Sequence, residues 1–525
     1  MLGTLFLITL PHLSFSSNIL IFDGVGGSHL NSLHEVAVLL ADHHHNVTLI
    51  SSVSGALLLY PSHPNIHHVE VAAWQPGEVR EMLGGCVAGV IQKHSSHALE
   101  SIGDDICLDP WRSIFDRAAS VLLGHEMLEM LNSVNNFDLM LGEKVESNGM
   151  AILGKVTGIP VVNFELSFFI QSSLLNANLP LLLSSQPSLL LSDSFHLPPT
   201  FYERLGGLTS NLKVLAFEAM TKEVIQPYLN RFGFSRLDDV KSSIRLYFTN
   251  DHIALTFPFL RPPNDIAIGG FNLLSTHDDP PKFPTKVSEF IHESEQKPVV
   301  YISFGSLAPS GDSTWVDVIM KDLLSLDARV IMKQKIIDSY NPNNVLLLPW
   351  APQKELLMSG KITLFISHCG NNGRIEATFF NVPLLCVPLF ADQPFNAKIV
   401  SWKGFGEFIL KEDVPNKFKS IVTNMLINHD FYVTNMKRAS DIMKREPGTA
   451  KETLLFYIEH LVNYGNVDFL INDVIKKQSF VEIHNLDILF LSLVASISAL
   501  CIVLYGTYKC CFILGNFLKP KFKRY

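Results

Sequence analysis

Two segments of this chain combine a histidine with a glycine-rich turn directly after an apolar run. In the first, the apolar residues 18–22 lead into the sequence DGVGGSH, which ends at His29. A histidine after a strand lies at the edge where α/β sheets bind ligands, and an ordinary pKa near 6.5 suits a general base. Taken alone, a hydrated loop histidine is the commoner interpretation of such a residue.

The second segment, residues 350–393, holds the densest set of candidate binding residues. An apolar run ends at Ser367, and the Gly/Asn-rich turn that follows is expected to open a helix. Free backbone N–H groups and the positive end of the helix dipole make such a turn an anion site. His368, inside this turn, is able to donate a hydrogen bond to a phosphate.

Other side chains in the same segment suit a nucleotide carrying a sugar. Trp350 offers a flat surface for a nucleotide base. Glu376, one turn into the helix expected after the Gly/Asn-rich turn, is able to accept hydrogen bonds from two ribose hydroxyls. Asp392 and Gln393 add polar groups suited to sugar hydroxyls. Each residue alone also fits an ordinary structural role. The sequence holds no Walker P-loop and no HExxH, GxSxG or DxD motif, so no metal is expected.

These segments lie within two alternating series of short apolar runs and helical patterns. The first predicts strands at 18–22, 47–50, 66–71, 137–141 and 161–164 and helices at 30–41 and 111–131. The second predicts strands at 299–304, 329–333, 345–348, 364–367 and 384–387 and a helix at 316–324. Such alternation indicates α/β domains with parallel sheets, and the Pro-rich passage between them indicates a linker and a ligand cleft. The leucine-rich residues 165–235 fit helices lining an apolar cavity or an ordinary core.

Composition and the chain ends point to a membrane. Of the 525 residues, 47% are hydrophobic and 17% charged, and the net charge of −9 argues against a nucleic-acid partner. Residues 1–13 are apolar and short, and small residues follow, as in a signal peptide, although a buried first strand is the alternative. Residues 488–508 carry no charge, which fits one transmembrane helix, and the basic tail beyond them is expected in the cytosol.

The segment 350–393 resembles the signature of UDP-glycosyltransferases. The whole layout resembles the membrane-bound UDP-glucuronosyltransferase branch of animals rather than the soluble plant enzymes. The resemblance implies two Rossmann-like domains facing a cleft (GT-B type) and a C-terminal transmembrane helix. The expected organisation is a signal peptide (1–16), an acceptor-binding domain (17–256), a linker (257–285), a UDP-sugar-binding domain (286–450), helices leading to the membrane (451–487), the span (488–508) and a cytosolic tail (509–525). The last five residues resemble a dilysine retention signal, which implies a type I protein of the endoplasmic reticulum with lumenal catalytic domains.

The resemblance also assigns roles to individual residues. Trp350 would stack on uracil, Gln353 would contact the nucleoside and Glu376 would hold the ribose. The diphosphate would be met by Ser306, His368, Gly370, Asn372 and Gly373. The donor sugar would be held by Asp392 and Gln393. His29 would be the catalytic base. The family places an aspartate five residues after a Phe-Asp pair, and here Glu143 occupies that position after Phe137-Asp138. Glu143 keeps the charge but is longer by one methylene, and Glu146 is an alternative candidate.

The expected reaction is an inverting transfer of a glycosyl group, glucuronosyl first, from a UDP-sugar to a hydroxyl of a small lipophilic acceptor. No cofactor is implied besides the donor substrate, and association into a homo-oligomer stays open. One alternative is a glucosyl- or other hexosyltransferase of the same fold. The other is an inactive, membrane-anchored protein that binds lipophilic ligands.

Overall fold

The computed structural model describes residues 16–75, 78, 105–133, 137–166, 200–256, 261–273, 283–292, 297–305, 314–333, 344–389, 392–471, 479–483 and 485–517. The expected site residue Ser306, the predicted signal peptide up to residue 15, parts of the linker, residues 167–199 of the leucine-rich region and the last eight residues lie outside these ranges. The chain forms two compact units, one of residues 1–173 and 182–471, the other of residues 174–181 and 472–525.

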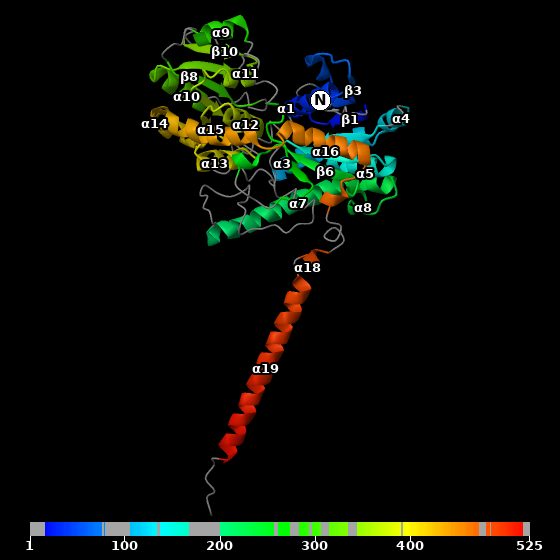
Figure 1. The fold of residues 1–525 in the computed structure, drawn as a ribbon. Coiled ribbons are helices and arrows are strands. Elements are labelled where there is room, and N and C mark those ends of the chain that lie inside the picture. Colours follow the sequence, from blue (N-terminus) through cyan, green and yellow to red (C-terminus); the bar gives the residue numbers. More distant parts are fainter. Residues whose placement is uncertain are drawn as a thin grey trace, which may run out of the picture. The chain divides into compact units, whose positions relative to one another are not determined.

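The first sheet of the larger unit has seven parallel strands in the order β3-β2-β1-β4-β5-β6-β7. Its strands are β1 (Asn18–Asp23), β2 (Asn46–Val53), β3 (Ile66–Trp74), β4 (Leu139–Glu143), β5 (Val161–Glu165), β6 (Ile244–Thr249) and β7 (Asp265–Ala267). Its helices are α1 (Ser28–Asp42), α3 (Asp105–Leu122), α4 (His125–Ser133), α5 (Ser147–Thr157), α7 (Phe201–Arg231) and α8 (Asp238–Lys241) (Figure 1). The strands consist mostly of apolar residues because helices bury both faces of the sheet.

The second sheet repeats this plan with six parallel strands in the order β10-β9-β8-β11-β12-β13. The strands are β8 (Val299–Ser303), β9 (Arg329–Lys333), β10 (Val345–Leu348), β11 (Leu364–Ser367), β12 (Leu384–Cys386) and β13 (Gly406–Phe408). The helices are α9 (Thr285–His292), α10 (Thr314–Ser325), α11 (Gln353–Met358), α12 (Asn371–Phe379), α13 (Gln393–Lys403), α14 (Val414–Ile427) and α15 (His429–Arg445). Both sheets therefore have the Rossmann strand order, which reverses between β1 and β4 and between β8 and β11.

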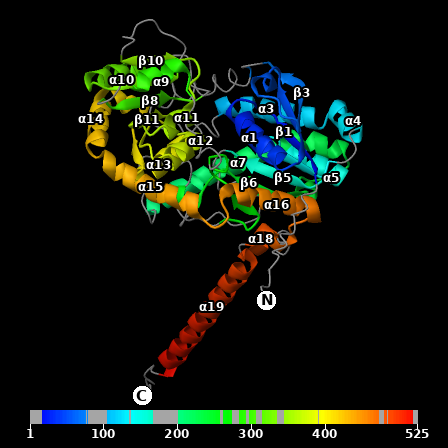
Figure 2. The same ribbon diagram turned by 45° about the horizontal axis from the view of Figure 1, so that its top comes forward.

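The chain returns to the first sheet through its helix α16 (Ala450–Tyr464). Leu454, Ile458 and Leu461 of α16 are fully buried in the same apolar core as Ile19 and Ile21 of β1. Figures 1 and 2 both show α16 beside α5 and β6. A segment that follows the second sheet in sequence thus completes the core of the first.

The structure corrects two of the predicted elements. The expected helix over 111–131 is two helices, α3 and α4, because the chain turns at Gly124. There the N–H of Gly124 donates to the carbonyl of Val121, and a Cβ on Gly124 would lie 2.8 Å from the Ser120 carbonyl oxygen. The strand expected at 137–141 is shifted two residues towards the C-terminus, so that it ends at Glu143.

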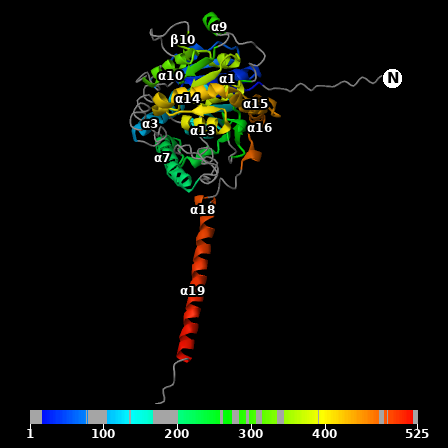
Figure 3. The same ribbon diagram turned by 90° about the vertical axis from the view of Figure 1, so that its left-hand side faces the viewer.

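The smaller unit contains α18 (Phe480–Ile483) and α19 (Leu486–Phe517). Within α19, Leu486–Leu514 is the one stretch among the described residues that is long and apolar enough to cross a membrane, and none of it is buried. Figure 3 shows α19 as one uninterrupted helix. The predicted C-terminal apolar helix is confirmed, and it extends beyond the expected residues 488–508.

Candidate active site

The loop between β1 and α1 brings His29 to the carboxyl edge of the first sheet. Gly26 and Gly27 have φ angles of 77° and 65°, a region that glycine enters without steric cost. The N–H of Gly26 donates to both carboxylate oxygens of Asp23, at 3.0 Å each, which closes the turn. Helix α1 then begins at Ser28, so His29 lies in its first turn.

Glu143 lies beside His29 because β4 pairs in parallel with β1 and the two strands end together. The Nδ1 atom of His29 is 3.4 Å from Oε1 of Glu143, and the side chains are 28% and 4% exposed. The other oxygen of Glu143 accepts from the N–H of Val145 at 3.1 Å. The structure therefore places the two expected catalytic residues at ion-pair distance.

The electrostatics of this pair favour a charged imidazole. Burial alone lowers the pKa of His29, but the negative charges of Glu143, Asp23 and Asp392 together outweigh it and raise the pKa above the ordinary 6.5. Burial acts to raise the pKa of Glu143, but the charge and hydrogen-bonding capacity of His29 bring it below its ordinary value. The carboxylate thus stabilises the form of His29 that has taken up a proton.

Two further buried carboxyl groups lie at the same edge, and sequence analysis gave Asp23 no role. Asp23 accepts from the Ser51 hydroxyl at 3.0 Å as well as from Gly26. Glu146, in the turn between β4 and α5, accepts from the N–H of Gly24 at 2.7 Å. A charged residue at the end of an otherwise apolar strand was the available signal for Asp23.

The second histidine turn follows β11, as expected. Cys369 has a φ of 63°, its N–H donates to the Ser367 hydroxyl at 3.1 Å, and α12 begins at Asn371. A disulfide joins Cys369 to Cys386 at the end of β12. The expected phosphate-binding turn is therefore tied to the neighbouring strand by a covalent bond that the sequence did not predict.

Glycines make room for the imidazole of His368. A Cβ on Gly370 would lie 2.5 Å from Nε2 of His368, and one on Gly305 would lie 2.7 Å from the same atom. Burial, aided by the charge of Lys333, lowers the pKa of His368 to about 4. His368 is therefore neutral at physiological pH, beside the N-terminus of α12.

The expected nucleoside residues form a connected group. Gln353 donates to Glu376 at 2.7 Å and accepts from the Tyr301 hydroxyl at 3.3 Å. Burial raises the pKa of Glu376 to about 7. Trp350 is 66% exposed, and the Lys333 ammonium lies 4.4 Å from the centre of its ring. Gly373, inside α12, is in contact distance of Gln353, since a Cβ there would lie 3.7 Å from its amide nitrogen.

The expected sugar-binding residues lie at the start of α13. Asp392 and Gln393 are 7% and 4% exposed. Asp392 accepts from Asn396 at 2.9 Å, and Gln393 accepts from the N–H of Leu389 at 2.9 Å. The charge of Asp392 also raises the pKa of His29, so the start of α13 lies within electrostatic range of the His29–Glu143 pair.

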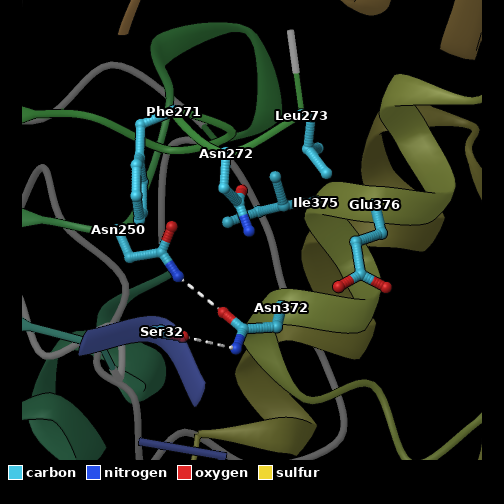
Figure 4. Close-up of a pocket in the computed structure, with 8 residues that line it drawn as sticks. All are labelled: Ser32, Asn250, Phe271, Asn272, Leu273, Asn372, Ile375 and Glu376. Atoms are coloured by element: carbon cyan, nitrogen blue, oxygen red, sulfur yellow. Dashed lines mark hydrogen bonds between the residues drawn. The ribbon is translucent and has the colours of Figure 1, made fainter. Parts of the chain in front are cut away.

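Asn372 joins the two halves of the site directly (Figure 4). Its amide donates to the Ser32 hydroxyl of α1 at 3.1 Å, and its oxygen accepts from Asn250 at 2.6 Å. These residues border a small polar pocket lined by Ser32, Asn250, Phe271, Asn272, Leu273, Asn372, Ile375 and Glu376. Among the residues that the structure describes, no group of three metal-binding side chains occurs.

The comparisons with known proteins identify the family. The family model described as "UDP-glucoronosyl and UDP-glucosyl transferase" matches residues 18–524, and the chain belongs to this family of glycosyltransferases. UDP-glucuronosyltransferase 3A1 of Bos taurus is 28% identical over 94% of each chain. UDP-glucuronosyltransferase 1A3 of Homo sapiens is 25% identical over 76% of this chain and 73% of its own. UDP-glucosyltransferase 2 of Dactylopius coccus is 26% identical over 45% of each chain.

Solved structures share the fold. Os79 from O. sativa, in complex with UDP, has a TM-score of 0.60 at 15% identity and covers 85% of this chain and all of its own. The calicheamicin glycosyltransferase CalG4 has a TM-score of 0.56 at 15% identity, covering 86% of this chain and 99% of its own. The fold is therefore GT-B, and the expected fold class is confirmed.

Proposed function

We propose that this protein transfers a glucuronosyl group from a UDP-sugar to a hydroxyl of a small lipophilic acceptor, with inversion, and that His29 is the base. The observation that supports it most is the His29–Glu143 pair, which lies within electrostatic range of Asp392, the proposed donor-sugar residue. Two mammalian relatives bear the name UDP-glucuronosyltransferase, which favours glucuronate as the sugar.

The proposed reaction is a single displacement. Because Nδ1 of His29 lies against Glu143, Nε2 is left to take the proton from the acceptor hydroxyl. The acceptor oxygen then forms a bond to the anomeric carbon from the side opposite UDP, and the bond between that carbon and the diphosphate breaks. UDP leaves with the bonding electrons, and Glu143 stabilises the imidazolium that has formed.

The proposed donor site extends from α12 to α11. The free N–H groups at the start of α12, with His368 and Asn372, would hold the diphosphate. Glu376, oriented by Gln353, would accept from the ribose hydroxyls. The role of Ser306 stays a prediction, because that residue lies outside the described ranges.

An apolar surface next to the catalytic pair supports a lipophilic acceptor. Val25, in the loop before His29, and Val145, two residues after Glu143, pack like Trp111 against the buried cluster of Trp74 and Ile114. Trp111 and Phe217 are half-buried and lie edge to face, 6.2 Å between ring centres. Aromatic rings in this position would bind a planar or apolar acceptor.

We also propose that α19 anchors the enzyme in the endoplasmic reticulum membrane with the catalytic domains in the lumen. The support is the apolar stretch Leu486–Leu514 together with the basic residues that follow residue 508. Protease protection of the enzyme in sealed microsomes tests this orientation.

The function is tested with the full-length protein in microsomal membranes. Labelled UDP-glucuronate and UDP-glucose are each supplied with a panel of phenols, and glucuronide formation is the expected result. His29→Ala should abolish transfer while UDP binding stays intact. His125→Ala, at an exposed histidine on α4, is the matched control. Transfer from UDP-glucose alone would indicate the glucosyl alternative, which the Dactylopius relative favours, and unchanged turnover of His29→Ala would refute the base.

A further inference from the structure

Three buried carboxyl groups lie at the same edge of the first sheet as the loop that carries His29. Asp23, Glu143 and Glu146 are 1%, 3% and 1% exposed, at the ends of β1 and β4 and in the turn before α5. Asp23 accepts from Gly26 and from a hydroxyl, and Glu143 faces His29. Glu146 differs, since its Oε2 atom is buried and has no hydrogen-bond partner among the described residues.

Glu146 holds together the two segments that carry the catalytic pair. Its Oε1 atom accepts from the N–H of Gly24, in the loop that leads to His29. A Cβ on Gly24 would lie 2.2 Å from the same oxygen, so the carboxyl group packs directly on the loop backbone. The N–H of Glu146 donates to the carbonyl of Glu143 at 3.1 Å. Displacing Glu146 would therefore move His29 and Glu143 relative to each other.

The neighbouring charges that act most strongly on the pKa of Glu146 are negative. The groups that act on its pKa are Glu143 and Asp23, both negative, while His29 and Lys144 act on Glu143. Burial raises the pKa of Glu146 well above its ordinary value, and the two neighbouring carboxylates raise it further. Its backbone hydrogen bond to Gly24 acts in the opposite direction but is weaker.

We propose that Glu146 is a positioning residue for the catalytic base, which stays a neutral carboxylic acid and fixes the loop that carries His29. This inference rests on the proposed role of His29. A third negative charge beside Glu143 and Asp23 would stabilise the imidazolium of the resting enzyme. Because a protonated His29 cannot accept a proton, a neutral Glu146 preserves the base while keeping its hydrogen bond to the loop.

Two variants of the full-length enzyme separate the geometry from the charge. Glu146→Met removes the acceptor for Gly24, and kcat should fall roughly 10- to 100-fold while KM for the UDP-sugar is unchanged. Glu146→Gln keeps the shape and the acceptor oxygen and has no proton to lose, so it should retain most of the turnover that Glu146→Met loses. Glu129→Gln, at an exposed glutamate on α4, is the matched control.

The pH profile gives the deciding measurement. In Glu146→Gln, the acid limb of kcat/KM, which reports the titration of His29, should coincide with that of the wild type. An acid limb displaced to lower pH would show that Glu146 is ionised at rest and would overturn the inference. Wild-type kcat in Glu146→Met would overturn the positioning role, and if that variant does not fold, the glutamine variant decides.

Infrared spectroscopy tests the inference independently of transfer activity. Glu376, whose pKa is raised to about 7, also contributes a carbonyl band at neutral pH, so the spectrum of Glu146→Gln is subtracted from that of the wild type. The difference should contain the carbonyl band of a protonated carboxylic acid. Absence of this band from the difference would refute the neutral state of Glu146 even if the enzyme is active. If the wild type transfers no glycosyl group at all, the proposed function is refuted instead.

Discussion

A fully buried ion pair joins Arg374 of α12 to Asp251, just after β6, and it allows a test of what holds α12 in place. Both side chains are 0% exposed, and Nη2 of Arg374 is 3.0 Å from Oδ1 of Asp251. The guanidinium also donates to the Leu255 carbonyl at 2.7 Å and to Asn371 at 2.8 Å. The arginine thus connects the first turns of α12 to the chain that leaves the first sheet.

Arg374→Met should destabilise the protein strongly. Removing one partner leaves the Asp251 carboxylate buried, with the Arg261 guanidinium at 3.7 Å as its nearest remaining cation among the described residues. Breaking a buried pair costs about 3–5 kcal/mol. At about 2–4 °C per kcal/mol, the value for domains of about 150–250 residues, the melting temperature should fall by roughly 6–20 °C.

A double-mutant cycle in detergent-solubilised full-length protein measures the pair itself. Asp251→Asn should be destabilised to a similar degree, since it leaves a buried guanidinium without its counter-charge. The double variant should be less destabilised than the sum of the two single variants, with a coupling of at least about 1.5 kcal/mol. Additive effects, or a loss below about 1 kcal/mol in Arg374→Met, would refute the reasoning.

Three further predictions concern the site. Because the pKa of His29 is raised, kcat/KM of the wild type should rise with pH through a midpoint above 6.5. Glu143→Gln removes the negative charge that stabilises the imidazolium, so it should lower both kcat and that midpoint. An unchanged midpoint in this variant would contradict the pairing of His29 with Glu143. Gly370→Ala should weaken UDP binding in a calorimetric titration, since its Cβ would lie 2.5 Å from Nε2 of His368; wild-type affinity would contradict the close packing. Cys386→Ala should cost about 3 kcal/mol of stability by opening the disulfide to Cys369, and dithiothreitol should lower the melting temperature of the wild type but not of the variant.

The sequence alone predicted the features that depend on neighbouring residues. Alternating apolar runs predicted two parallel α/β sheets, because a strand buried on both faces must be apolar whatever its partner. The loop before His29 was located because Gly26 and Gly27 permit the positive φ angles that it requires. In the turn after Ser367 the positive φ falls on Cys369, and Gly370 leaves room for the His368 ring. The uncharged stretch 488–508 predicted an apolar helix because its composition suits lipid, and α19 confirms it.

Tertiary structure decided what lies beside what. Glu143 meets His29 only because β1 and β4 are neighbours in the sheet, and Glu146 reaches Gly24 across 122 residues of sequence. The ion pair of Arg374 with Asp251 depends in the same way on how α12 packs against the chain after β6. Apolar periodicity reports that a residue is buried but does not identify its partner. The partner is set by strand order and helix packing, which are properties of the whole fold.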